Sequence, residues 1–144
     1  MKRRTVRTLL FTAAMLIAAG RAVIAEAHDV SDFLGAAAGA VDYAQVTCGP
    51  NTHHLFFQID DVTTVDGIQM SVVVHKGNAA ASATAPDGGT SPSNMLVGSP
   101  GPGVYNVFIT KTKSGSPNYH LLYHCQNADS TVHTLTTIAI KQDQ

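Results

Sequence analysis

Histidine is the residue type with the clearest chemical potential in this sequence. All seven histidines of the 144-residue chain lie between positions 28 and 133: His28, His53, His54, His75, His120, His124 and His133. Only four lysines and no arginine accompany them after position 27. Neutral imidazole is the commonest protein ligand for metals and suits copper, zinc and nickel. The sequence therefore makes metal binding the first chemical hypothesis.

His28 follows Ala25-Glu26-Ala27, a small-x-small pattern typical of leader cleavage sites. Cleavage after Ala27 would let the α-amine and imidazole of His28 chelate copper, with a second imidazole completing a nitrogen site. Cleavage after Ala25 would make histidine the third residue, an arrangement that favours square-planar Cu(II) or Ni(II). Both cuts predict a terminal copper site. The alternative is that His28 is the first residue of a frayed end.

Two cysteines, Cys48 and Cys125, follow the leader. In an exported chain a pair of cysteines is expected to form a disulfide, because the compartment is oxidising. Each cysteine falls on the apolar face of a run that alternates like a strand. The alternative is that Cys125, next to a histidine, is a copper ligand.

The expected disulfide also predicts a second histidine cluster. His53 and His54 follow Cys48 by a few residues, and His124 precedes Cys125. The bond would draw these three imidazoles towards one end of the domain. His120 and His124 share a strand face but lie about 13 Å apart along it, which is too far for one ion. The metal ligands predicted from sequence are thus His28, His53, His54 and His124, with solvated strand histidines as the alternative.

Residues 1–27 have the pattern of a cleaved signal peptide. Basic residues near the start precede the apolar run Leu9–Gly20, which is too short to span a bilayer as a helix. No lipid-attachment cysteine follows this run. The sequence therefore predicts a periplasmic or secreted protein without a stable membrane anchor, and a single domain over residues 28–144.

The charge of residues 28–144 argues against a nucleic-acid partner and against a helical fold. Nine aspartates and no glutamate stand against four lysines, so the formal charge is −5. Binding to nucleic acid requires lysine and arginine to displace phosphate counterions, so a nucleic-acid partner is not expected. The lack of glutamate and arginine also argues against exposed helices, which use both on their wet faces.

Most of the remaining chain alternates apolar and polar residues with the period of a β-strand. The clearest runs are Tyr43–Cys48, His54–Ile59, Ile68–His75, Val104–Lys111, Tyr119–Cys125 and Thr134–Lys141, separated by turns rich in Gly, Pro and Asn. Val30–Gly39 fits a short helix or an edge segment, and Ala83–Gly103 reads as a long irregular stretch with one short strand at Asn94–Val97. We expect an all-β antiparallel sandwich or jelly roll of about six to eight strands.

Part of this pattern resembles a known family. Gly103-Val104-Tyr105-Asn106-Val107, followed by Tyr119-His120-Leu121, is similar to the Gly-x-Tyr-x-Val and Tyr-x-Leu strands of the bacterial pre-peptidase C-terminal (PPC-like) domain. The similarity spans roughly Asp42 to Tyr123, and Ile68–Ser71 stands where that family has an Asp-rich strand. The resemblance implies a jelly-roll sandwich and a non-catalytic module.

No catalytic signature accompanies these features. The chain lacks a Gly-x-Ser-x-Gly nucleophile elbow, a phosphate-binding glycine loop and a Cys-x-x-Cys pair. Two hypotheses follow: an exported copper-binding or copper-handling sandwich, and a non-catalytic module that binds protein or carbohydrate without a metal.

Overall fold

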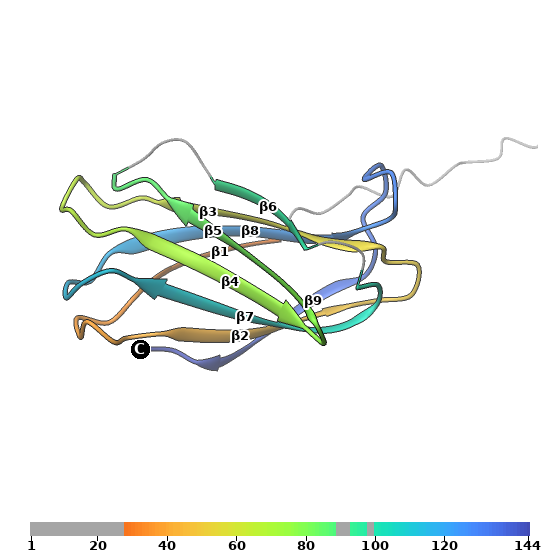
Figure 1. Ribbon diagram of the computed structural model, residues 1–144, viewed down its shortest axis with the longest axis horizontal. Coiled ribbons are helices and arrows are strands. Elements are labelled where there is room, and N and C mark those ends of the chain that lie inside the picture. Colours follow the sequence, from red (N-terminus) through yellow and green to blue (C-terminus); the bar gives the residue numbers. More distant parts are fainter. Residues whose placement is uncertain (1–27, 89–92, 98–99) are drawn as a thin grey trace, which may run out of the picture.

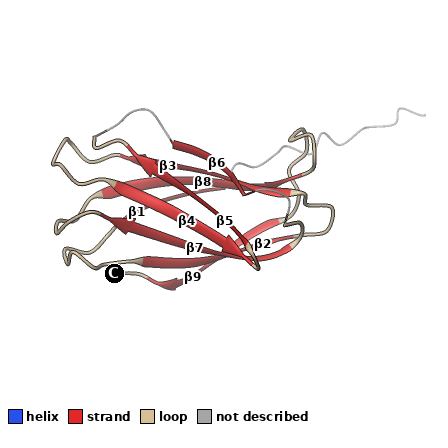
Figure 2. Cartoon of the chain, viewed as in Figure 1, coloured by secondary structure: helices blue, strands red, loops and turns tan. Residues whose placement is uncertain are grey.

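The computed structural model describes residues 28–88, 93–97 and 100–144, and within them the chain is built from strands without any helix. Residues 1–27, the predicted signal peptide, lie outside the described residues, as do 89–92 and 98–99. The strands are β1 (His28–Phe33), β2 (Asp42–Cys48), β3 (His54–Asp61), β4 (Met70–Lys76), β5 (Ala79–Ala85), β6 (Ser93–Val97), β7 (Gly103–Lys111), β8 (Asn118–Gln126) and β9 (Thr136–Gln142). Figures 1 and 2 show them in two facing layers.

The strand pairing is that of a jelly roll. One sheet has the order β1-β8-β3-β6 and the other β5-β4-β7-β2-β9. The antiparallel pairs β4–β5, β3–β6, β2–β7 and β1–β8 are nested, as in a long hairpin rolled into two sheets. β9 then extends the second sheet beyond β2. The expected antiparallel sandwich is confirmed.

The core lies between the sheets and follows from the alternation in the sequence. Successive strand residues point to opposite faces, so every second residue of β2, β3, β4, β7 and β8 is buried. The largest fully buried side chains are Tyr105, Phe57, Leu34, Leu55, Ile59, Met70 and Leu121. Most polar residues of the same strands therefore face outward, and Asp42 and Asp61 are exceptions that lie on the buried face.

Cys48 and Cys125 are joined by a disulfide, as predicted. Cys48 ends β2 in one sheet and Cys125 lies near the end of β8 in the other, with Cα atoms 5.6 Å apart. Both are buried in the core. The bond links the two sheets at one end of the sandwich and removes Cys125 from the set of metal ligands.

The described residues form nine strands, where the sequence predicted about six to eight. β1 resolves the ambiguity at Val30–Gly39 in favour of an edge strand. β5 enters the stretch expected to be irregular, because its Ala, Ser and Thr residues give only weak alternation. It is held by pairing along β4 from Met70↔Ala85 to Lys76↔Ala79. Among the described residues no helix is long and apolar enough to cross a membrane.

Candidate metal centre

The histidines are concentrated on one of the two sheets. His28, His54, His120 and His124 lie on strands of the sheet β1-β8-β3-β6. His53 immediately precedes β3, and His133 forms an isolated bridge with Gln126 of β8. His75, on β4, is in the other sheet. The jelly-roll topology thus places histidines from distant parts of the sequence on one sheet.

His53 and His54 form the closest imidazole pair. Their Nδ1 atoms lie 3.2 Å apart, and the two rings are perpendicular to one another. His54 is the first residue of β3 and is buried, whereas His53 is exposed at the end of the turn that follows Cys48. The backbone nitrogen of His53 donates to the Gln126 carbonyl, which ties this turn to β8. The two histidines therefore lie side by side at the end of the turn that follows Cys48.

This spacing suits two ligands of one metal ion. Imidazole nitrogens about 2.0 Å from an ion stand about 2.8–3.3 Å apart when the angle at the metal is between about 90° and about 110°. The observed separation of 3.2 Å falls within that interval. Without an ion, one nitrogen must donate a proton to the other. The same separation is therefore found in a hydrogen bond and between two ligands of one metal ion.

The second ring nitrogen of His54 is held by neighbours. His54 Nε2 lies 3.0 Å from Gln126 Oε1 and 3.0 Å from Ser130 Oγ. The Gln126 oxygen can only accept, so His54 Nε2 carries the proton and Nδ1 of the uncharged ring keeps its lone pair. Ser130 reaches this position from a turn in which its own φ is +61°. Such outer contacts fix the tautomer and orientation of histidine ligands in metal sites.

His124 lies in a stack of three rings on the outer face of the sheet. Its imidazole packs against Phe56, with centroids 4.7 Å apart, and against His133, with centroids 4.3 Å apart, and both contacts are nearly parallel. His124 is 8% exposed. The Nδ1 atoms of both His124 and His133 are buried and have no hydrogen-bond partner within the described part of the chain.

Burial lowers the pKa of His124 to about 4. The neighbouring imidazoles of His133 and His28 lower it in the same direction, while an interaction with the backbone of Tyr123 acts against them. The imidazole is therefore uncharged at neutral pH. An uncharged imidazole is the form that binds metal, so no proton has to be removed from this ring on binding.

His28 begins β1 at the edge of the same sheet. It is the register partner of Tyr123, and the two rings stack with centroids 5.8 Å apart. Because the strands are antiparallel, the backbone nitrogen of His28 points along the edge towards the level of His124. Its side chain is half-buried in the described structure.

The structure brings together the predicted ligands only in part. His53 and His54 meet, and His54 is a diagonal neighbour of His124 because it opposes Gln126 while Phe56 opposes His124. In the described residues, however, no three histidine nitrogens lie within 4.8 Å of one another. The stacking partner of His124 is His133, which the sequence did not single out. Its only sequence signal was its presence in a chain rich in histidine.

His120 has a different environment from the other sheet histidines. Its Nε2 lies 3.3 Å from Asp29 and its Nδ1 lies 3.4 Å from Asp60, so both ring nitrogens face carboxylates. A ring placed in this way is suited to ion pairing on the surface. The distance of four strand residues from His124 also separates it from the other imidazoles, as the sequence predicts.

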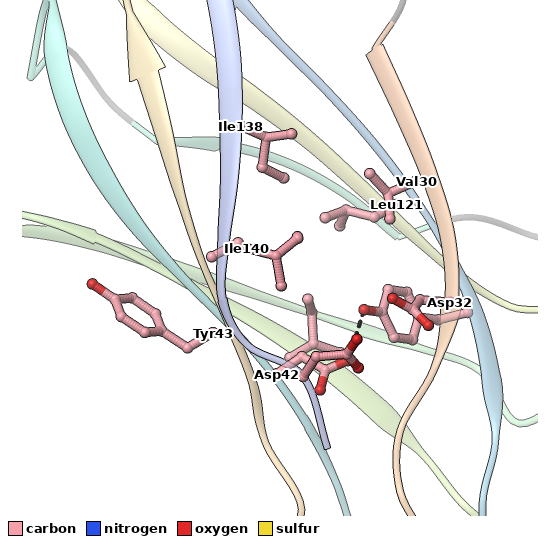
Figure 3. Close-up of a pocket in the computed structure, with 11 residues that line it drawn as sticks. Val30, Asp32, Asp42, Tyr43, Leu121, Ile138 and Ile140 are labelled. Atoms are coloured by element: carbon pink, nitrogen blue, oxygen red, sulfur yellow. Dashed lines mark hydrogen bonds between the residues drawn. The ribbon is translucent and has the colours of Figure 1, made fainter.

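An acidic cluster lies at the opposite end of β8 and was not predicted. Oxygens of Asp32, Asp42 and Asp143 lie within 4.8 Å of one another, the only set of three such ligand residues in the described part of the chain. Figure 3 shows Asp32 and Asp42 beside a pocket that β1 and β9 border. Tyr119 donates to Asp42 Oδ2 at 2.8 Å and the Gln144 backbone nitrogen donates to Oδ1 at 2.9 Å. Burial raises the pKa of the Asp42 carboxyl.

These contacts give the acidic cluster a structural explanation. Asp42 joins β2 to Tyr119 of the other sheet and to Gln144, so it ties three segments together.

No protein-family model matches this chain, and no curated protein matches it. The arrangement of side chains is therefore the evidence for function.

Proposed function

We propose that this protein is an exported, periplasmic or secreted, copper-binding protein whose metal clamp is formed by His53 and His54. The observation that carries the proposal is the 3.2 Å separation of the two Nδ1 atoms, with the far nitrogen of His54 held by Gln126 and Ser130. This is the spacing of adjacent ligands on one ion, supported by outer contacts. His53 is exposed, so the clamp opens to solvent.

Two considerations support copper over other ions. Imidazole ligands select zinc, copper and nickel over calcium and magnesium, and copper leads the affinity order among divalent ions. A clamp of two nitrogens leaves the remaining positions of the ion for water or a further ligand. Such an open site fits transient binding or transfer of copper better than a closed structural site. The chain from residue 28 has a formal charge of −5, which supports neither nucleic acid nor anionic lipid as a partner.

The test is copper binding by the exported protein, isolated after removal of its leader. We expect Cu(II) to bind in competition with a chromophoric chelator, with nitrogen ligation visible by electron paramagnetic resonance. His53→Ala and the pair His53→Ala/His54→Ala should each weaken binding at the clamp at least tenfold. The hydrogen bonds of Gln126 and Ser130 make His54 part of the packing, so the single His53→Ala variant is the safer one for folding.

The matched control is His75→Ala, since His75 is an exposed histidine on the other sheet. It should leave the copper affinity unchanged. If His53→Ala binds copper as tightly as the unaltered protein, the clamp is wrong. If the unaltered protein holds no copper against the chelator, the proposal of copper binding is wrong. The non-catalytic binding module implied by the PPC-like resemblance then becomes the better account.

A further inference from the structure

One side of the sandwich is open between its edge strands β1 and β9. The sheet that contains β1 has four strands, and the sheet that contains β9 has five. On the opposite side of the sandwich the edge strands β5 and β6 contact each other, so the additional strand of the second sheet overhangs next to β1. Figure 3 shows β1 and β9 on the two sides of one pocket.

The inner face of β9 carries apolar side chains that the first sheet leaves partly uncovered. Ile138 and Ile140 alternate with Ala139 and both line the pocket, together with Val30 of β1 (Figure 3). Ile138 is half-buried, and Ile140 is 49% exposed. This side of the core therefore presents an apolar strip to solvent.

The backbone of β1 has a free edge beside this strip. Within the described residues β1 pairs only with β8. Alternate residues of an edge strand direct their backbone N–H and C=O groups away from the paired neighbour, and such an edge accepts an additional strand from another chain. A strand added to β1 would make the first sheet five strands wide. It would lie opposite β9 and cover the two isoleucines.

Carboxylates close one end of this open side. Asp32 lies near the end of β1, Asp42 begins β2 and Asp143 follows β9, with oxygens within 4.8 Å of one another. Asp42 is buried, whereas Asp143 is exposed. The only ion pairs in the described part of the chain are those of His120, so no lysine there neutralises these carboxylates. A cationic side chain at this end would reduce their mutual repulsion.

We propose that the β1–β9 groove, lined by Val30, Asp32, Ile138, Ile140 and Asp143, binds an extended segment of a partner protein as an additional strand beside β1. The segment has apolar side chains at every second position, which pack on the isoleucines. A lysine or arginine on the same face meets the carboxylates. Antiparallel pairing, as in every strand pair of this sheet, places that basic residue at the N-terminal end of the segment.

Charge favours a different protein over a second copy of this chain as the occupant. A second β1 would bring the aspartates Asp29 and Asp32 to an edge that already carries them. β9 contains Lys141, but alternation places this lysine on the face opposite to Ile140. The groove is also independent of copper, because the His53–His54 clamp lies beside the other end of β8.

The experiment uses a synthetic peptide, acetyl-Lys-Thr-Val-Thr-Val-Thr-amide, labelled with a fluorophore at its C-terminal end. Its lysine and both valines share one face of a strand. Binding to the protein, isolated after removal of its leader, is followed by fluorescence anisotropy with EDTA present. We expect saturable binding, and we expect a peptide with glutamate in place of lysine to bind at least about fivefold more weakly.

Methylation of the peptide backbone tests strand addition itself. One peptide carries N-methyl groups on both valines and a second carries them on the first two threonines. Alternate N–H groups of a strand point to opposite edges, and only one edge of the added strand pairs with β1. Only one of the two methylated peptides should therefore lose binding.

Variants of the protein test the two walls of the groove. Ile140→Thr should weaken binding about fivefold, because it removes apolar surface that the peptide covers. The matched control is Val104→Thr, since Val104 has a similar exposure of 46% on β7. The double variant Asp32→Asn/Asp143→Asn should weaken the lysine peptide by about fivefold. Asp29→Asn, on the other face of β1, should have no effect.

Three results would overturn the proposal. The first is the absence of saturable binding of the lysine peptide at millimolar concentrations. The second is equal binding by the two methylated peptides, or equal affinities in Ile140→Thr and Val104→Thr. The third is a dimer of the protein alone, seen by sedimentation, that Ile140→Thr converts to a monomer; the occupant would then be a second copy of the chain.

Discussion

Cys48 of β2 and Cys125 of β8 join the two sheets through a buried disulfide between residues 77 positions apart in sequence. Removing this cross-link frees a long loop in the unfolded chain, which in the chain-entropy model costs about 4 kcal/mol of stability. We expect the paired variant Cys48→Ala/Cys125→Ala to unfold at markedly lower urea concentration. Equilibrium unfolding with and without a reductant checks this. Equal midpoints for the oxidised and reduced protein would contradict the prediction.

Burial of His124 makes the stability of the domain sensitive to pH. The unfolded imidazole takes up a proton near pH 6.5, whereas the folded one does so near pH 4. Between these values the unfolded state binds more protons, so the free energy of unfolding should fall as pH drops from about 6.5 to about 4, by up to about 3 kcal/mol. Urea unfolding at several pH values, without metal, measures this slope.

The variant His124→Phe is the control for that pH dependence. It keeps a ring between Phe56 and His133 but has no titrating nitrogen. The slope between pH 6.5 and pH 4 should be smaller in this variant. The raised pKa of Asp42 acts in the opposite direction and is common to both proteins, so their difference isolates the histidine. An unchanged slope would mean that another group carries the effect.

The Tyr119–Asp42 hydrogen bond should contribute measurably to stability. Both residues are buried, the bond is 2.8 Å long, and it connects the two sheets. Tyr119→Phe leaves the Asp42 oxygen without this donor and should cost about 2 kcal/mol, in the range for a hydrogen bond to a carboxylate. Tyr43→Phe is the matched control, because its hydroxyl bonds a neutral amide, Asn106, in a part-buried place. A larger loss for Tyr43→Phe would contradict this ranking.

Gln126 should act on copper through His54. Its side-chain oxygen fixes the protonated nitrogen of His54, and removal of such an outer partner typically lowers metal affinity about 10–100-fold. We expect Gln126→Leu to weaken the clamp by about tenfold in chelator competition, with less effect on the fold because Ser130 remains on the same nitrogen. The control is Gln58→Leu, because Gln58 lies on the same face of β3 as His54, and this variant should leave the copper affinity unchanged. Equal affinities in both variants would show that His54 needs no such support.

Much of the fold followed from local pattern. Alternation in runs such as Tyr43–Cys48 and Tyr119–Cys125 assigns one face of each strand to the core, because successive side chains point in opposite directions. The same alternation predicted that both cysteines point inward. Their pairing was predicted because an exported chain is expected to reach an oxidising compartment. β5 could not be recognised in this way. Its small residues carry little hydrophobic contrast, and it exists because β4 offers a complete row of hydrogen-bonding partners.

Some contacts of the candidate site could likewise be predicted from the sequence, and others could not. Convergence of His53 and His54 could be anticipated, because the two residues are adjacent and follow a turn. The stack of His124 on His133 depends on the bridge from Gln126 to His133, and the stack of His28 on Tyr123 depends on the register of β1 with β8. The acidic cluster likewise joins the ends of β1, β2 and β9. Such contacts are set by how distant strands align, and sequence spacing carries no record of that alignment; only the packed sandwich decides it.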